Sequence, residues 1–490
     1  MKTIFDRSRN GRSGTSLKNS GQFSQDWIPE QMRGTGLDLP EVDELTLVRH
    51  YTRLSKMNFS VDSNFYPLGS CTMKYNPKIN EQAASREGFS STHPLTSQER
   101  IQGILKLMYE LGAMLGEIAG LSSVTLQPAA GAHGELTGLM IASACFEKRG
   151  ERGKRTEILI PDSAHGTNPA SAALCGYTVR EVSSNSDGLI DIEDFREKLS
   201  SRTALMMITN PNTLGLFEER IEEIGRALHD NGSLLYMDGA NLNAIMGIAR
   251  PGDFGVDIMH FNLHKTFSTP HGGGGPGSGP VGVTDELDPF LPVPVLEKRD
   301  TEYILNEDRP DSIGRVRSFY GNVPVMVKAY TYLRALGSKG IRRVSENAVL
   351  NANYLKSRLE KTFDIPFGAD RPCMHEFVIS AEQLKNDYGV TALDIGKGLI
   401  DRSFHPPTVY FPLIVPEAMM IEPTETESIE TLDAFAECMD DLLKNPETLR
   451  TAPRNTDVSR PDEVKAARNP VLKQNTLSSK REHKGDADQC

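Results

Sequence analysis

The hydrophobic pattern in the middle of the chain alternates short apolar runs with amphipathic stretches. The apolar runs predict strands at residues 157–160, 177–182, 205–209 and 233–237. The amphipathic stretches between them predict helices at residues 168–175, 191–199 and 218–229. Strands separated by helices of this length form right-handed crossovers and a mostly parallel sheet. The pattern therefore predicts an α/β fold.

Amphipathic segments flank this region on both sides. Residues 98–118 carry apolar side chains at helical spacing, which predicts a core helix before the sheet. After the sheet, the pattern predicts helices at 323–336 and 344–363, a strand near 375–380 and a helix near 427–443. We therefore expect an N-terminal arm (1–64), a large domain (65–322), a smaller α+β domain (323–445) and an extended tail (446–490). The last stretch, 473–490, is polar enough to be disordered.

Composition narrows the functional classes. The 490 residues contain 54 Lys+Arg and 66 Asp+Glu, a net charge of −12, which argues against a nucleic-acid partner. No run approaches the ~18 apolar residues of a membrane span. The six cysteines form no C-x-x-C pair, and the first 20 residues lack the apolar core of a secretory signal. We expect reduced thiols and a cytoplasmic location.

Candidate chemistry lies in the polar segments that follow the apolar runs, because ligands of open α/β sheets bind beyond the carboxyl ends of strands. Lys265 directly follows the apolar run 254–263. A partly desolvated lysine there can have a lowered pKa and act as a nucleophilic amine. A structural, ion-paired lysine is the alternative interpretation.

Asp238 ends another apolar run and is followed by the small residues Gly239 and Ala240. A carboxylate there could pair with a protonated ring nitrogen, while Ala240 leaves room for a flat ring. The alternatives are a helix N-cap and a magnesium ligand.

A turn of small residues at 127–135 leads into a helix predicted at 136–146. Such a turn at a helix N-terminus suits a phosphate. His133 within it could stack on an aromatic ring or simply cap the helix.

Glycines 272–275, 277 and 279 would let the backbone approach a phosphate, although neither a P-loop nor a dinucleotide fingerprint is present. A metal bound by His260, His264 and His271 is the competing hypothesis. The segment is predicted as a strand, so the i, i+4 spacing of the first two histidines would not bring them together.

The order of these features along the chain is informative. A phosphate turn precedes a strand-end aspartate, and a strand-end lysine follows 27 residues later. Fold-type I enzymes that use pyridoxal 5'-phosphate (PLP) have the same order of parts. In them the lysine forms a Schiff base with the cofactor, and the aspartate keeps the pyridine nitrogen protonated.

Longer segments carry a more specific resemblance: FYPLGSCTMKYNP (65–77), LQPAAGAHGE (126–135), PDSAHGTNPAS (161–171), TNPNTLGL (209–216), DGANLN (238–243), LHKTFSTPHGGGG (263–275) and residues 408–428. Together they resemble the decarboxylating glycine dehydrogenase subunit 2 family, the P-protein of the glycine cleavage system. The resemblance spans roughly residues 67–472 and leaves out both ends of the chain. It implies the fold-type I PLP-dependent transferase-like fold.

The resemblance also implies residue roles. Lys265 would carry PLP, Asp238 would face the pyridine nitrogen, and Ala240 and His133 would pack on opposite faces of the ring. The implied catalytic residues are Lys265, Asp238 and His133. The implied phosphate ligands are Ala130, Gly131, Ala132 and His264. The implied contacts to the ring hydroxyl are Thr209 or Asn210, and the implied pocket for the glycine carboxylate is formed by His165, Thr167 and Asn168.

Members of this family decarboxylate glycine and transfer its aminomethyl group to the lipoyl cofactor of the H-protein. The resemblance therefore implies glycine dehydrogenase subunit 1 and lipoylated H-protein as partners, in a heterotetramer with subunit 1. Two alternatives remain: another fold-type I PLP amino-acid decarboxylase or lyase, and a catalytically silent scaffold that binds subunit 1. The presence of both Lys265 and Asp238 favours an enzyme.

Overall fold

The computed structural model describes residues 2–14, 28–34, 39–272 and 277–472. Its contacts divide the chain into two compact units, one of residues 1–60 with 453–490 and one of residues 61–452. All the candidate site residues belong to the second unit. The finer domain boundaries near residues 64, 322 and 445 stay predictions.

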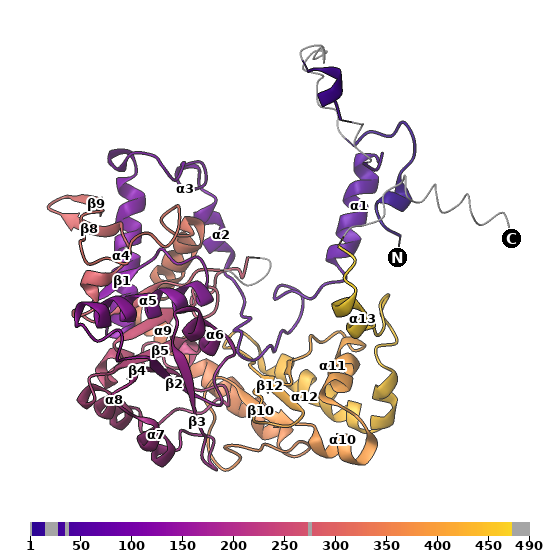
Figure 1. Ribbon diagram of the computed structural model, residues 1–490. Helices are drawn as coiled ribbons and strands as arrows, with labels where there is room; N and C mark the ends of the chain where they lie inside the picture. Colours follow the sequence, from indigo (N-terminus) through magenta and orange to yellow (C-terminus); the bar gives the residue numbers. More distant parts are fainter. Residues whose placement is uncertain (1, 15–27, 35–38, 273–276, 473–490) are drawn as a thin grey trace. The chain divides into compact units, whose positions relative to one another are not determined.

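A seven-stranded sheet forms the centre of the second unit (Figure 1). The strands lie in the order β1-β7-β6-β5-β4-β2-β3. The five strands β6, β5, β4, β2 and β3 are parallel, each to its neighbour in this order. Strand β7 pairs antiparallel with both β6 and β1. The bounds are β1 Ser123–Thr125, β2 Glu157–Pro161, β3 Thr178–Val182, β4 Thr203–Thr209, β5 Leu234–Gly239, β6 Ile258–Phe261 and β7 Val281–Val283. The predicted α/β fold with a mostly parallel sheet is confirmed.

Side chains of the central strands alternate between two hydrophobic clusters, because successive residues of a strand point to opposite faces. In β4, Leu205 and Met207 join one cluster, and Met206 and Ile208 join the other. Helices α5 and α6 cover the first face, and α4, α7, α8 and α9 cover the second. The bounds are α4 Gln102–Ala119, α5 Gly131–Lys148, α6 Thr167–Leu174, α7 Ile192–Lys198, α8 Ile221–Asp230 and α9 Val323–Leu359. Burial on both faces explains why these strands are continuous apolar runs.

Helix α9 changes direction at Gly337, whose φ of +62° and ψ of −179° are not helical. Glycine adopts a positive φ without the steric cost of a side chain. The two helices predicted at 323–336 and 344–363 are the two parts of α9. The second part starts directly after Gly337, earlier than the apolar pattern predicts.

A second, three-stranded sheet has the order β10-β12-β11 and packs with the second part of α9 and with α10, α11 and α12 around its own hydrophobic cluster. The bounds are β10 Phe377–Ser380, β11 Thr408–Val409, β12 Ala418–Ile421, α10 Glu382–Tyr388, α11 Ala392–Ile400 and α12 Ile429–Leu443. The predicted strand and the predicted last helix are confirmed as β10 and α12. A hairpin of β8 (Val295–Arg299) and β9 (Glu302–Asn306) is a further element that the pattern did not predict.

Short helices also occur near the ends of the chain. Residues Pro446–Thr451 form a 3₁₀ helix, and α13 (Glu463–Arg468) begins where the side chain of Asp462 accepts the N–H of Lys465. The expectation of an extended tail is therefore wrong for these segments, because an N-cap aspartate favours a helix start. Residues 473–490, expected to be disordered, lie outside the described residues. Three further α-helices of the described ranges are α1 Glu44–Ser55, α2 Lys78–Ala84 and α3 Glu87–Ser90.

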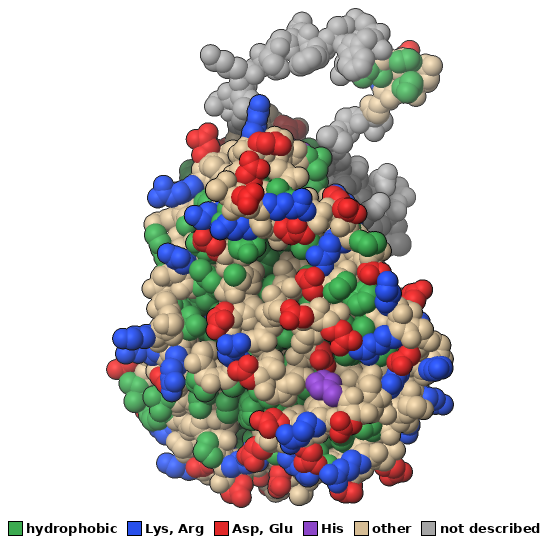
Figure 2. Space-filling view, turned by 90° about the vertical axis from the view of Figure 1, so that its left-hand side faces the viewer, with side chains coloured by type: hydrophobic (Ala, Val, Ile, Leu, Met, Phe, Trp, Pro, Cys, Tyr) green, Lys and Arg blue, Asp and Glu red, His purple; other side chains and the backbone are tan. Residues whose placement is uncertain are grey.

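The surface carries charges of both signs, interspersed over the face drawn in Figure 2. Across the described ranges, no helix is both long enough and apolar enough to cross a membrane. Five of the six cysteines fall within these ranges, and all five are free thiols.

Candidate active site

Polar residues meet at the carboxyl ends of three parallel strands. Thr209 at the end of β4 lies opposite Asp238 of β5, and Asp238 lies opposite His260 of β6. Lys265 lies in the loop that follows β6. The strand-end segments therefore meet at one edge of the sheet, as the topology predicts.

Asp238 is a buried carboxylate held by three neighbours. Its Oδ1 accepts the backbone N–H of Ala240 (2.9 Å) and lies 3.2 Å from Nε2 of His260. Its Oδ2 accepts from Nδ2 of Asn168 (3.1 Å). Burial raises the pKa of Asp238, but His260, Lys265 and these donors outweigh burial and hold that pKa below its usual value. Asp238 is therefore ionised at neutral pH.

Tyr236 orients the ring of His260. The tyrosine hydroxyl lies 3.0 Å from Nδ1, and burial raises the pKa of Tyr236 well above its usual value, so the hydroxyl stays protonated. The contact of Nε2 with the Asp238 carboxylate favours the tautomer with its proton on Nε2, and the tyrosine hydroxyl then donates to Nδ1. The side-chain amide of Asn262 lies 3.0 Å from the same Nε2.

Glu135 is a second buried carboxyl group beside Asp238, and the sequence analysis missed it. Its Oε2 accepts from Nδ2 of Asn168 (3.2 Å) and from Oγ of Ser171 (3.3 Å). Burial, and then the charge of Asp238, raise the pKa of Glu135 to about 8, so this group is protonated at neutral pH. An acid one helical turn after Gly131, in an otherwise small and apolar helix, was the available signal.

The side chain of Lys265 points into the protein. Its Nζ donates to the backbone oxygen of Ser70 at 2.8 Å, although the two residues are 195 positions apart. The charge of Lys265 contributes to the low pKa of Asp238, so the two groups are electrostatically coupled. The amine of Lys265 is therefore held inside the site, close enough to Asp238 for the two charges to interact.

The turn before α5 has the features of an anion site. Ala130 is extended (φ −156°, ψ 164°), and Gly131 begins the helix. The first N–H groups of a helix have no acceptor within it, and the helix dipole favours an anion there. Those groups belong to Gly131, Ala132 and His133. Gly279 packs so closely that a Cβ at that position would overlap the backbone oxygen of Ala130.

His133 is tied to this turn. Its Nδ1 accepts the backbone N–H of Ala129 at 3.1 Å. Burial, and then the charge of Arg317, lower the pKa of His133, so the ring is neutral. This bond ties the ring to the residue before the N-cap, and both helix capping and stacking on a cofactor ring stay predictions.

The histidines after β6 do not gather into a three-histidine metal site. His264 and His271 pack edge to face with ring centroids 5.0 Å apart. Within the described part of the chain, His260 groups instead with Glu135 and Asp238. Among the described residues, the ring nitrogens of His260, His264 and His271 do not come close enough to form the three-histidine group that the competing hypothesis names. Burial lowers the pKa of His264 to about 3, so this ring is neutral.

The glycine run is described only in part. Residues 273–276 lie outside the described residues, so their predicted approach to a phosphate stays a prediction. Gly277 has a φ of +50°, and a Cβ there would overlap the ring of His264. Close packing against this histidine requires glycine at that position.

Three buried polar atoms, two at the end of β4 and one at the start of α6, lack hydrogen-bond partners among the described residues: Oγ1 of Thr209, Nδ2 of Asn210 and Oδ1 of Asn168. The side chain of Asn210 is otherwise fixed, because its Oδ1 accepts the N–H of Glu218 at 2.9 Å. Unpaired buried polar atoms are costly. A bound polar ligand at this edge would satisfy them.

His165 and Thr167 lie just before and at the start of α6. Their side chains are hydrogen-bonded to each other, and the ring of His165 packs edge-on against Phe411 at 5.6 Å. His165 is exposed, whereas Asn168 is buried and already donates to the two carboxyl groups. The predicted role of all three in binding a substrate carboxylate stays a prediction.

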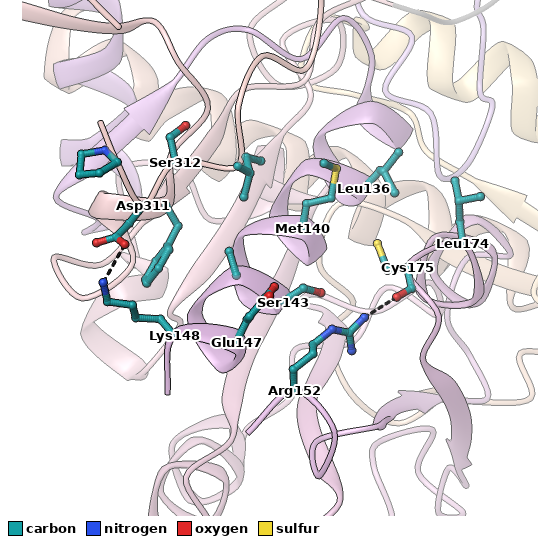
Figure 3. A pocket seen from close by; sticks show the side chains of 14 residues that line it. Leu136, Met140, Ser143, Glu147, Lys148, Arg152, Leu174, Cys175, Asp311 and Ser312 are labelled. Carbon is teal, nitrogen blue, oxygen red and sulfur yellow. Dashed lines mark hydrogen bonds and ion pairs between the residues drawn. The ribbon is translucent and has the colours of Figure 1, made fainter. Parts of the chain in front are cut away.

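A pocket of about 700 Å³ lies on another side of α5 (Figure 3). Met140 and Leu174 line it, and the ion pair between Lys148 and Asp311 (2.8 Å) closes one side. None of the predicted site residues is among its described lining residues. We assign the chemistry to the strand ends, where ionisable groups with shifted pKa values converge.

Two protein-family models match the chain. Residues 137–275 match the aminotransferase class-V family, and residues 344–460 match the family described as glycine dehydrogenase, C-terminal domain. The first match contains Asp238 and Lys265.

Among solved structures, the chain is similar to a glycine decarboxylase (P-protein) of the glycine cleavage system in inhibitor-bound form. The TM-score is 0.70 and the identity 21%, over 86% of this chain and 94% of that one. An apo cysteine desulfurase from Thermococcus onnurineus NA1 is similar with a TM-score of 0.61 and 16% identity, over 78% of this chain and 96% of that one. These likenesses confirm the fold expected from the sequence, that of the fold-type I enzymes.

Curated relatives are much more similar in sequence. The probable glycine dehydrogenase (decarboxylating) subunit 2 of Prosthecochloris aestuarii is 59% identical, over 95% of this chain and 97% of its own length. The proteins of the same name from Caldanaerobacter subterraneus and Listeria innocua are 58% and 56% identical, each over 96% of this chain and 98% of theirs. The chain therefore belongs to the glycine dehydrogenase (decarboxylating) subunit 2 family.

Proposed function

We propose that this chain decarboxylates glycine with PLP bound at Lys265. The observation that carries the proposal is the arrangement of an ionised, buried Asp238 and an inward-pointing Lys265 amine at neighbouring strand ends. Bound PLP supplies an electron sink for the electron pair that remains on carbon when CO₂ leaves. An electron sink of this kind needs a protonated ring nitrogen, which an ionised aspartate stabilises.

The residues at this edge fit the cofactor. Asp238 offers a negative charge for the ring nitrogen, and the N–H groups of Gly131 and Ala132 offer donors for the phosphate. Thr209 has a buried hydroxyl with no partner within the described ranges, which suits the ring hydroxyl. The small side chain of Ala240 beside Asp238 leaves space for a flat ring.

The charge and exposure of the remaining site residues support a separate role for each of them in this reaction. Glu135 stays neutral and leaves the single negative charge on Asp238. Lys265 holds the cofactor and, as a free amine, can hold a proton near the substrate. His165 and Thr167 are the most accessible of the predicted carboxylate contacts and carry no fixed charge. A pocket with little positive charge suits a carboxylate that must depart as CO₂.

The partners follow from the family. The relatives are named subunit 2, so a partner subunit belongs to the assembly, and we propose that it is glycine dehydrogenase subunit 1. The aminomethyl group would pass to one sulfur of the lipoyl disulfide of the H-protein, while the other sulfur is reduced to a thiol. We also propose a cytoplasmic location, supported by the free thiols of the described cysteines.

The test is glycine-dependent exchange of labelled bicarbonate into glycine, with subunit 1 and lipoylated H-protein present. We expect exchange that requires this chain and PLP. A chain that binds PLP at Lys265 but gives no exchange would instead be another fold-type I amino-acid decarboxylase or lyase. A chain that binds no PLP would be a scaffold.

A further inference from the structure

The backbone segment 67–72 lies along the end of β12. The N–H of Gly69 donates to the backbone oxygen of Met420 at 3.2 Å, and the N–H of Glu422 donates to that of Pro67 at 3.3 Å. A Cβ at Gly69 would overlap the side chain of Met420, so the two backbones are in close contact. The segment is therefore fixed to the smaller sheet.

Two buried glutamates hold the same segment from within. The N–H of Ser70 donates to Oε2 of Glu376 at 2.7 Å, and Oγ1 of Thr72 donates to Oε1 of Glu422 at 2.6 Å. Both glutamates are at most 1% exposed. Ser70 has a φ of +63°, a left-handed conformation that is unfavourable for a residue with a side chain. The bond from Glu376 stabilises this conformation.

The held residue is the one that contacts Lys265. The backbone oxygen of Ser70 accepts from Nζ of Lys265 at 2.8 Å. Glu376 is in turn fixed by Asn241, whose Nδ2 donates to Oε1 of Glu376 at 3.2 Å. Asn241 lies three residues after Asp238. Hydrogen bonds thus link Glu376 both to Ser70, which contacts Lys265, and to Asn241, in the segment that follows Asp238.

The charge state of the cluster supports this role. His375 lies 3.9 Å from Glu376 and 4.0 Å from Glu422, and burial lowers its pKa to about 3, so its ring is neutral. Burial raises the pKa of Glu376 to about 7 and that of Glu422 well above its usual value. The other charged group that acts on both carboxyls is Lys265, with Glu425 also acting on Glu422. Glu422 therefore holds the proton at neutral pH, while Glu376 is the more acidic of the two and accepts the N–H groups of Ser70 and Asn241.

We propose that Glu376 is a positioning residue for Lys265, acting through the backbone of Ser70, and that Glu422 secures the same segment at Thr72. This proposal rests on the proposed function, in which Lys265 is the residue that bonds to PLP. Glu376 directly precedes β10 of the smaller sheet, and Lys265 lies in the loop after β6 of the larger one. The direction of the reactive amine is thus set from outside the loop that carries it.

The test measures how fast cofactor-free protein forms its bond to added PLP, from the growth of visible absorbance. Glu376→Ala frees Ser70, and we expect attachment to slow at least about tenfold, because small misplacements of a reacting group are costly. Glu376→Gln keeps an oxygen for the N–H of Ser70 and should slow attachment less than about threefold. Borohydride reduction and peptide mapping confirm that the bond forms at Lys265 in each variant.

Glu417→Ala is the matched control. Glu417 directly precedes β12 of the smaller sheet, its side chain is only 7% exposed, and its Oε2 accepts the N–H of Ala392 at 2.9 Å. This variant should lose thermal stability without slower attachment. If Glu376→Ala does not fold, Glu376→Asp takes its place in the test. The aspartate carboxylate lies one methylene further from Ser70, so we expect this variant to attach PLP at least about threefold more slowly than the wild type.

Attachment at the wild-type rate in Glu376→Ala, or in Glu376→Asp where that variant has to be used, would overturn the positioning role. Equal slowing in the Glu417 control would also overturn it, because the effect would then follow stability alone. Failure of the wild-type chain to form a visible band with PLP would overturn the proposed function itself. The two failures are therefore distinguishable.

Discussion

Asp238 and Glu135 accept hydrogen bonds from the same atom, Nδ2 of Asn168, at 3.1 and 3.2 Å. The two buried carboxyl groups differ in charge, because Asp238 has further donors in Ala240 and His260 while Glu135 has only weak ones. Two adjacent buried carboxyls cannot both ionise without a large cost. The protonated glutamate thus lets the aspartate keep the charge that the proposed chemistry needs.

Glu135→Gln should change how stability depends on pH. The folded-state pKa of Glu135, about 8, lies above its unfolded value near 4.5, so this proton favours the folded state at low pH and that gain is lost as pH rises to about 8. As the pH rises towards 8, this group therefore lowers the free energy of unfolding of the wild type by at most about 1.4 kcal/mol per pH unit. The melting temperature of Glu135→Gln minus that of the wild type should therefore increase as the pH is raised from 6 to 8.5.

The exposed Glu181 on β3 provides the control for that experiment. Glu181→Gln should follow the wild-type dependence on pH. Parallel curves for Glu135→Gln and the wild type would show that Glu135 is ionised in the folded protein, contrary to the assignment.

Asp238→Asn removes the charge at the end of β5 and keeps the shape of the side chain. We expect bicarbonate exchange to fall by about 10- to 100-fold, the worth of a hydrogen bond to a charged group. Asp162→Asn is a matched change at the end of β2, where Asp162 accepts from the N–H of Ser184. Full exchange activity in Asp238→Asn, measured with PLP bound, would contradict the assigned role.

Gly279→Ala tests the packing behind the phosphate turn. The added methyl would overlap the backbone oxygen of Ala130, so we expect a loss of stability of about 1–3 kcal/mol and weaker PLP binding. Gly153→Ala adds a methyl where no atom lies within 4 Å and should change neither. Equal melting temperatures and equal PLP affinity for the two variants would show that the turn is not constrained by Gly279.

Lys74→Met tests the buried ion pair that fixes the segment after Thr72. Nζ of Lys74 lies 2.8 Å from Oε1 of Glu425, and both side chains are buried. Its removal leaves an unpaired buried charge, so we expect a destabilisation of about 3–5 kcal/mol, partly recovered when Glu425→Leu is added. Lys148→Met breaks an exposed pair with Asp311 and should cost less than about 1 kcal/mol. A double variant no more stable than Lys74→Met would contradict this account.

Strands β2, β4, β5 and β6 could be predicted from the sequence because they are buried on both faces and appear as continuous apolar runs. The three-residue strands β1 and β7 of the same sheet were not predicted. Asp238 and Lys265 stand at the ends of such runs, which is why they could be singled out. The short strands β11 and β12 could not, since β11 has two residues and β12 has four.

Contacts between segments that are distant along the chain could not be predicted from the sequence either. The bond from Lys265 to Ser70 uses a backbone oxygen, which no side-chain pattern marks. Glu135 was missed because its protonation depends on the nearby charge of Asp238, and that proximity exists only in the fold. The role of Glu376 likewise depends on the packing of the smaller sheet against the segment 67–72.

The most direct test of the central claim is borohydride reduction of the PLP-loaded protein, followed by peptide mapping. We predict that the reduced cofactor is found on Lys265, and that Lys265→Ala retains its fold but loses the visible absorbance of bound PLP. Cofactor attached to another lysine, or undiminished visible absorbance in Lys265→Ala, would contradict the account.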